Sequence, residues 1–160
     1  MMISLALAIS ITLMYSAPLV FSALGGVITQ RSGVDNIGIE GMMTFGAFGA
    51  AVVGLFSGNA WLGFLAGGLF GALLGLVHAY VAVTLKGSQT ISGIALNIIG
   101  LALSIFFTRG LFNGGAQTDV VQAKIPKLFD LLGIDKTGSP LLQSADIDMT
   151  VILALLCVLI

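Results

Sequence analysis

Four long apolar runs dominate this sequence, and they decide what kind of fold the chain can adopt. They cover residues 1–28, 37–56, 61–85 and 91–107. Crossing the hydrocarbon core of a bilayer takes about 20 helical residues. Only 8% of the residues are charged, whereas a soluble domain carries about 25%. We therefore predict an all-α integral membrane protein, a polytopic helical bundle with about four full transmembrane helices.

The rest of the sequence is a polar loop and a short apolar end. Residues 113–148 hold most of the aspartates and lysines, and we expect a solvent-side loop with a small amphipathic element at residues 125–134. Residues 149–160 are too short to span the bilayer, so we expect a partial fifth helix. We interpret residues 1–160 as one transmembrane domain that is incomplete at its C-terminus. Pro18 predicts a kink or a break in the first helix.

Three charged residues lie between the first two apolar runs, in a glycine-rich segment. They are Arg31, Asp35 and Glu40. An ionisable group in a membrane helix is a functional candidate, so Glu40 is interpreted as lining or gating a solute pathway. The alternative is an acid that complements the dipole at a helix start. Arg31 and Asp35 are spaced to pair if the segment is locally helical, and Arg31 could instead reach Glu40. The sequence leaves open whether residues 28–50 form a turn or a re-entrant segment.

Glycines recur every fourth residue along the third run. They are Gly63, Gly67, Gly71 and Gly75. Residues at this spacing lie on nearly one face of a helix. A face without side chains lets the backbone of another helix approach closely. We therefore predict that this stripe packs against a neighbouring helix and that the third helix is a scaffold.

The fourth run carries a face of small and polar residues. Its members are Gly93, Asn97, Gly100, Ser104 and Thr108, with Gln89 and Ser92 just before them. An unpaired amide is costly in apolar surroundings, so Asn97 either bonds to a neighbouring helix or faces a hydrated pathway. Hydroxyl and amide groups suit a neutral polar solute such as a nucleoside or a sugar.

Several other functions find no support in the sequence. No G-x-x-x-x-G-K-[ST] pattern is present, so the chain has no P-loop for ATP, and no H-E-x-x-H or G-x-S-x-G pattern indicates an enzyme. The net charge is −1 without a basic cluster, so no nucleic-acid partner is expected. His78 is the only histidine and Cys157 the only cysteine, so we expect no metal site. His78 is expected to be packed or interfacial, with a proton-linked role as the alternative.

Two segments of the sequence resemble a known family of transport proteins. Residues 16–50 read SAPLVFSALGGVITQRSGVDNIGIEGMMTFGAFGA, and residues 88–110 read SQTISGIALNIIGLALSIFFTRG. In this order and spacing they resemble permease subunits of bacterial nucleoside ABC importers. These subunits belong to a larger permease family that also handles branched-chain amino acids and simple sugars.

The resemblance implies a mechanism and a set of partners. The chain would be a permease in the bacterial inner membrane, working with a second permease subunit, a cytoplasmic ATP-binding cassette ATPase and an extracytoplasmic solute-binding lipoprotein. It would bind no cofactor itself, since the ATPase partner uses the ATP. The motif places five residues near the pathway: Asn36, Glu40, Gln89, Ser92 and Asn97. Arg31 and Asp35 are implied as a gating or structural pair.

Other functions and both membrane orientations stay open at this point. A permease for simple sugars or branched-chain amino acids is the first alternative. An ATP-independent transporter or channel, in which Glu40 or His78 handles protons, is the second, and a non-transporting scaffold is the third. Counting Lys and Arg places residues 113–148 in the cytoplasm, whereas the resemblance places them outside.

Overall fold

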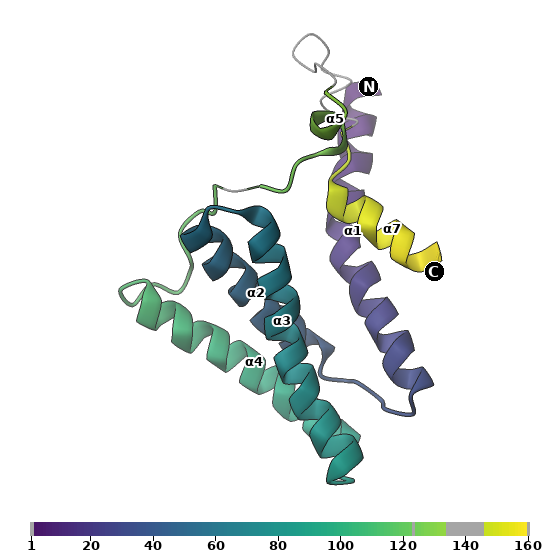
Figure 1. The fold of residues 1–160 in the computed structure, drawn as a ribbon, viewed down its shortest axis with the longest axis vertical. Coiled ribbons are helices and arrows are strands. Elements are labelled where there is room, and N and C mark those ends of the chain that lie inside the picture. Colours follow the sequence, from purple (N-terminus) through teal and green to yellow (C-terminus); the bar gives the residue numbers. More distant parts are fainter. Residues whose placement is uncertain (1, 123, 134–145, 160) are drawn as a thin grey trace. The chain divides into compact units, whose positions relative to one another are not determined.

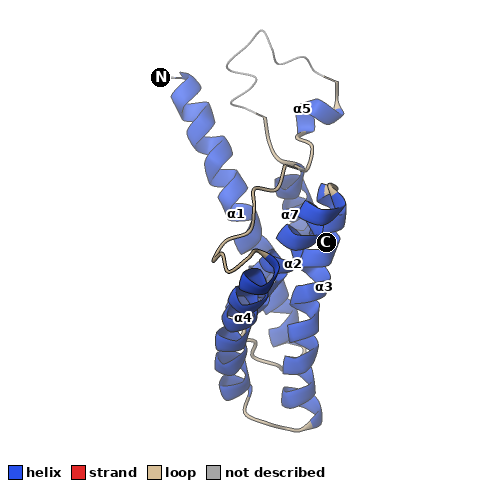
Figure 2. Cartoon of the chain, turned by 90° about the vertical axis from the view of Figure 1, so that its left-hand side faces the viewer, coloured by secondary structure: helices blue, strands red, loops and turns tan. Residues whose placement is uncertain are grey.

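The computed structural model describes residues 2–122, 124–133 and 146–159, and all its regular elements in these residues are helices (Figure 1, Figure 2). These are α1 (Met2–Arg31), α2 (Ile39–Ser57), α3 (Ala60–Ala79), the π-helix η1 (Tyr80–Thr84), α4 (Gln89–Leu111), α5 (Leu128–Leu131) and α7 (Met149–Leu159). The all-α prediction is confirmed.

Four helical stretches are long and apolar enough to cross a membrane. They are Ser4–Arg31, Ile39–Ser57, Ala60–Thr84 and Gln89–Leu111, the third formed by α3 together with η1. The apolar α7 is shorter than a spanning helix. The prediction of about four transmembrane helices and a shorter fifth is therefore confirmed.

Local sequence explains where several of these helices begin and end. Gly58, with φ of +64°, ends α2 in the left-handed conformation that glycine adopts without strain. The Asn59 side chain then accepts hydrogen bonds from the backbone N–H groups of Trp61 and Leu62, which starts α3. Ser88 starts α4 in the same way by accepting from the Ile91 N–H at 3.4 Å.

The chain divides into two compact units. The first contains α1 up to Gly25 together with α5 and α7, and the second runs from Gly26 to Lys124. In the first unit Ala17 of α1 is buried with Val151 and Ala154 of α7. The Ser10 hydroxyl donates to the Asp146 carbonyl at 3.1 Å, and the Asp146 carboxylate accepts from the Phe129 N–H at 3.0 Å. These bonds hold the start of α5 and the segment before α7 beside α1.

In the second unit α2 packs against both α3 and α4. The buried core consists of Phe45 and Phe48 of α2, Leu74 of α3 and Leu96 of α4. Phe70 completes an aromatic cluster, with its ring centroid 5.2 Å from that of Phe45. Such ring pairs contribute about 0.5–1.5 kcal/mol beyond the area they bury.

Glycines bring these helix backbones into close contact. A Cβ atom added to Gly63 would lie 2.9 Å from the Ala50 carbonyl oxygen, and one added to Gly67 would lie 3.0 Å from the Ala50 Cβ. Gly71 and Gly75 both face Met42 of α2. The structure thus places all four glycines of the predicted stripe against α2. A side chain at Gly63 would force the backbones of α2 and α3 apart.

The structure differs from two local predictions. Helix α1 runs through Pro18 without interruption, so the alternative of a helix break there is wrong. The amphipathic element expected at residues 125–134 is one short helix, Leu128–Leu131, preceded by an antiparallel bridge between Lys127 and Asp148. Ile134, the last residue of that element, lies outside the described residues.

Candidate functional site

The segment that connects α1 to α2 begins with a turn built on glycine. Gly33 has φ of +83°, and the N–H groups of Gly33 and Val34 donate back to the Gln30 and Thr29 carbonyls at 3.0 Å each. This pattern closes the end of α1. Residues 32–38 then connect α1 to the start of α2 at Ile39. We call residues 32–38 the connection.

Gln89, at the start of α4, bonds to two backbone groups of the connection. Its side-chain oxygen accepts from the Asp35 N–H at 2.7 Å, and its side-chain nitrogen donates to the Gly33 carbonyl at 3.3 Å. The amide therefore uses both its donor and its acceptor on the same loop. The connection is fixed to α4 by a residue 54 positions from Asp35 in the chain.

Asn97, two turns further along α4, caps the start of α2. Helix α2 follows Gly38, which has no side chain to cap it. The Asn97 side-chain oxygen accepts from the Gly41 N–H at 2.8 Å, and its nitrogen donates to the Ile37 carbonyl at 3.1 Å. The first N–H groups of a helix lack partners within it. Asn97 supplies one of these partners from a different helix.

His78 of α3 reaches the same connection from the other side. It is 2% exposed, with Nδ1 at 3.0 Å from the Ser92 hydroxyl and Nε2 at 3.4 Å from the Asp35 carbonyl oxygen. A carbonyl only accepts, so Nε2 carries the proton. In the neutral ring Nδ1 is then the acceptor of the Ser92 hydroxyl. The structure packs His78 as predicted and gives it two partners in place of a free ring nitrogen.

Gln89, Asn97 and His78 thus bind backbone groups of residues 33–41, and Ser92 bonds to the His78 ring; we call these four residues the polar clamp. Asn36, in the connection itself, accepts from the Gly38 N–H at 3.1 Å. Four of the five residues predicted near the pathway are therefore brought together here. In this structure their polar atoms satisfy backbone groups or one another, which for Asn97 is one of the two alternatives that the sequence left open.

The side chains of the charged residues in this region take no part in the polar clamp. Arg31, Asp35 and Glu40 are all exposed, and the Glu40 backbone carbonyl accepts the Thr44 hydroxyl at 2.8 Å. These three residues belong to the part of the chain that the structure describes, and it shows no ion pair among them. The roles predicted for Glu40 and for the Arg31–Asp35 pair stay predictions.

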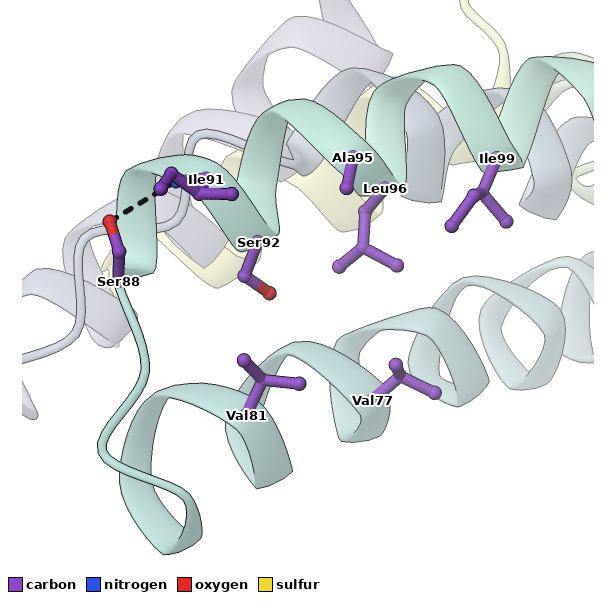
Figure 3. A pocket seen from close by; sticks show the side chains of 8 residues that line it. All are labelled: Val77, Val81, Ser88, Ile91, Ser92, Ala95, Leu96 and Ile99. Atoms are coloured by element: carbon purple, nitrogen blue, oxygen red, sulfur yellow. Dashed lines mark hydrogen bonds between the residues drawn. The ribbon is translucent and has the colours of Figure 1, made fainter.

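The structure has two hollows near these helices, and Ser92 of the polar clamp lines the first of them. The first, of about 340 Å³, lies between the end of α3, η1 and the start of α4 (Figure 3). Val77 and Val81 point from α3 and η1 toward Leu96 and Ser92 of α4, so the lining is mainly aliphatic. The Ser92 hydroxyl is bonded to His78. This hollow therefore offers an apolar space and little polar chemistry.

The second hollow, of about 450 Å³, has a mixed lining. It is bounded by α2, α4 and the segment after α4, through Thr44, Ala47, Phe48, Ala51, Ser104, Thr108, Ala116, Gln117 and Thr118. We call it the polar hollow. None of its residues is among the predicted pathway residues. The regular spacing of Ser104 and Thr108 along α4 was a sequence signal that could have indicated this hollow. No sequence pattern singled out Thr44 or Gln117.

Comparison with known proteins shows which family the sequence belongs to. Residues 8–160 match the family model of the permease component of branched-chain amino acid transport systems. The chain belongs to this family. The predictions of a multi-pass membrane protein and of a permease component, rather than an enzyme, are thereby confirmed.

Relatives share this part of their sequence with the chain. It is 42% identical over 138 residues to the guanosine ABC transporter permease protein NupQ of Bacillus subtilis, covering 79% of this chain and 43% of NupQ. It is 40% identical to the nucleoside ABC transporter permease protein NupC of Lactococcus lactis, covering 64% of this chain and 34% of NupC.

A third relative is named for a different solute. The putative glucose ABC transporter permease protein TsgC13 of Haloferax volcanii is 43% identical, covering 62% of this chain and 30% of TsgC13. The chain therefore spans less than half the length of each of these relatives. No solved structure matches the chain.

Proposed function

We propose that this chain forms part of the permease subunit of an ABC importer that carries nucleosides. The observation that carries the proposal is its 42% identity to a guanosine permease over 79% of its length. The polar side chains in and around its membrane helices add support, because most of them are uncharged hydroxyls and amides. Such groups form hydrogen bonds with a neutral solute without having to bury a charge.

A simple sugar is the second candidate solute. The relative named for glucose is 43% identical to this chain, so identity in the shared segment does not separate a nucleoside from a sugar. Both solutes are neutral and rich in hydroxyl groups. A branched-chain amino acid carries an ammonium and a carboxylate, and the lining of the polar hollow holds no charged residue to pair with either.

The proposed subunit works as part of a larger complex in the bacterial inner membrane. A second permease subunit completes the pathway, a cytoplasmic ATPase uses the ATP, and an extracytoplasmic binding lipoprotein delivers the solute. Residues 1–160 contribute a single permease domain and bind no cofactor. Family membership supports a partnership with an ATPase.

Within this subunit we propose that the connection and the polar clamp lie beside the pathway. The exposed carboxylate of Glu40 is in the first turn of α2, two residues from Gly38, so a clamp that fixes the connection also fixes where Glu40 points. Asn36, Gln89 and Asn97 then act on the pathway through the backbone they hold, and Ser92 acts through His78. Arg31, the last residue of α1, and Asp35, in the middle of the connection, are the proposed gating pair.

ATP hydrolysis by the complete transporter tests the proposed function. We expect the binding protein loaded with guanosine, inosine or uridine to stimulate hydrolysis by the reconstituted complex, and the protein offered ribose, glucose or leucine to leave the basal rate unchanged. A complex whose ATPase subunit lacks its catalytic glutamate is the control. Stimulation by leucine or by a sugar, with none by nucleosides, would overturn the proposal.

A further inference from the structure

The polar hollow is large enough for a small solute and combines surfaces of two kinds. Its volume of about 450 Å³ lies within the range of about 300–1,000 Å³ that is usual for small-molecule sites. Ala47, Phe48 and Ala51 form an apolar wall on α2, and hydroxyl and amide side chains face them from α4 and from residues 116–118. Ligand sites typically have this composition, with an apolar lining and a few polar groups that fix orientation.

Three of the four hydroxyl groups that line the polar hollow donate their protons to backbone carbonyls; the fourth is that of Thr118. Ser104 donates to the Gly100 carbonyl and Thr108 to the Ser104 carbonyl, both at 2.7 Å, and Thr44 donates to the Glu40 carbonyl at 2.8 Å. Each hydroxyl oxygen keeps lone pairs that can accept. Among the described residues the structure shows no donor to these three oxygens. These three hydroxyls therefore offer acceptors to a solute that donates hydrogen bonds, and the Thr118 hydroxyl and the Gln117 amide can also donate.

Charge narrows the class of solute further. No residue that lines the polar hollow is charged, and Ser104 and Thr108 are only 8% and 6% exposed. Placing an unpaired charge in such surroundings costs far more than placing a neutral group there. A nucleotide phosphate or an amino-acid zwitterion is thus disfavoured. A nucleoside fits, since its ribose hydroxyls donate and its base has an apolar face and a hydrogen-bonding edge.

We propose that the polar hollow is a nucleoside contact site on the transport pathway. The ribose hydroxyls donate to the oxygens of Thr44, Ser104 and Thr108, and the base lies along the wall formed by Phe48 and its neighbouring alanines. The Gln117 amide, which both donates and accepts, pairs with the edge of the base. This inference rests on the proposed function and adds to it the place of contact and the preference for a neutral solute.

Thiol labelling in the complete transporter tests the site directly. The variant Ala116→Cys is made after Cys157→Ser, which removes the only native cysteine of this chain, and after removal of any others in the complex. A maleimide is then added without ATP. Guanosine at ten times its Kd should slow labelling at position 116 about tenfold, whereas leucine should not. Asp119→Cys, on the same segment but outside the hollow, is the matched control and should label at one rate throughout.

A substitution that keeps side-chain shape gives a second readout. Thr108→Val removes one acceptor from the hollow, and the loss of one hydrogen bond should raise the KM for guanosine uptake about two- to tenfold. Thr90→Val changes an exposed threonine of the same helix and should leave the KM unchanged.

The outcomes separate the two proposals. Suppose the transporter carries guanosine, the Ala116→Cys variant is not protected and Thr108→Val keeps the wild-type KM. The contact site is then elsewhere and this inference is overturned, while the proposed function stands. Protection of the Ala116→Cys variant by leucine as strong as that by guanosine would also overturn it. A transporter that carries leucine or a sugar but no nucleoside would overturn the proposed function and the inference together.

Discussion

Asn97 is a residue of α4 that caps the start of a different helix, α2. Its side chain accepts from the Gly41 N–H of α2 and donates to the Ile37 carbonyl of the connection, at 2.8 Å and 3.1 Å. Gly38 precedes α2 and has no side chain to do this work. Gly38 also lies close to α4: a Cβ there would be 3.3 Å from the Gly93 Cα. The glycine allows the approach, and the asparagine replaces the cap that the glycine lacks.

Replacing Asn97 by Leu should therefore destabilise the protein measurably. The change leaves the Gly41 N–H and the Ile37 carbonyl without partners, at about 1–3 kcal/mol for each group that water does not reach. We expect a lower midpoint of thermal unfolding in detergent. Ile98→Leu, at an exposed neighbouring position, is the control and should keep the wild-type midpoint. Equal midpoints for both variants would show that Asn97 does not cap α2.

His78 and Ser92 should behave as one unit. Ser92→Ala leaves the buried Nδ1 atom without its hydroxyl partner, and His78→Leu removes the ring together with its bond to Asp35. Because the two residues share a bond, the double variant should lose less stability than the sum of the single ones. We expect a coupling free energy of about 0.5–3 kcal/mol from a double-mutant cycle of unfolding. Strict additivity would contradict the bond.

At the residue scale the sequence singled out polar residues but did not predict their partners. A lone amide at Asn97 and a lone histidine at His78 are conspicuous among apolar residues, so both were identified. Their partners include backbone groups of the connection, which lies over 40 positions away in the chain. Backbone groups carry no sequence signature. The clamp could therefore be seen only in the structure.

Among the elements of the second unit, α2 is central, because both α3 and α4 pack against it. Its small residues face two of them: Gly46 and Ala50 meet α3, and Gly41 meets α4, where a Cβ added to Gly41 would lie 2.7 Å from the Asn97 Cα. In a membrane, where lipid removes the hydrophobic driving force between helices, close packing at small residues is one of the forces that hold helices together. The spacing of these helices depends on glycine.

This dependence predicts opposite effects for two glycine-to-alanine changes. In Gly100→Ala the new Cβ would lie 2.7 Å from the Gly41 Cα, so α2 and α4 must separate, at a cost of about 1–3 kcal/mol. In Gly68→Ala the new Cβ meets nothing within 4 Å, and helix propensity should add about 0.5–1 kcal/mol of stability. Unfolding in detergent measures both. A stabilised Gly100→Ala variant would contradict the close crossing.

Element bounds followed from the sequence because hydropathy and capping residues set them. The run predicted at residues 61–85 corresponds to α3 and η1 together. The π-helical turn could not be predicted, since Tyr80–Thr84 is as apolar as the helix before it. It shows only in the backbone, where the Leu85 N–H donates to the Tyr80 carbonyl at 3.0 Å. Turns of this type often occur at functional sites, and Val81 of this one lines the first hollow, between η1 and α4.

At the scale of the whole molecule, the comparison with relatives concerns one segment of a longer protein. The chain spans 43% of the guanosine permease it matches. The polar hollow is widely open, and the exposed Glu40 has no side-chain partner within the described residues. A pathway formed with further protein would cover both. We propose that this completed pathway carries neutral nucleosides by using ATP from a partner subunit.

Uptake of labelled guanosine by proteoliposomes that contain the complete transporter and its binding protein is the decisive test of that proposal. We predict uptake that needs ATP, persists when an uncoupler removes the proton gradient, and is reduced by unlabelled inosine or uridine but not by leucine. Uptake that the uncoupler abolishes while ATP remains, or that leucine suppresses and nucleosides do not, would contradict it.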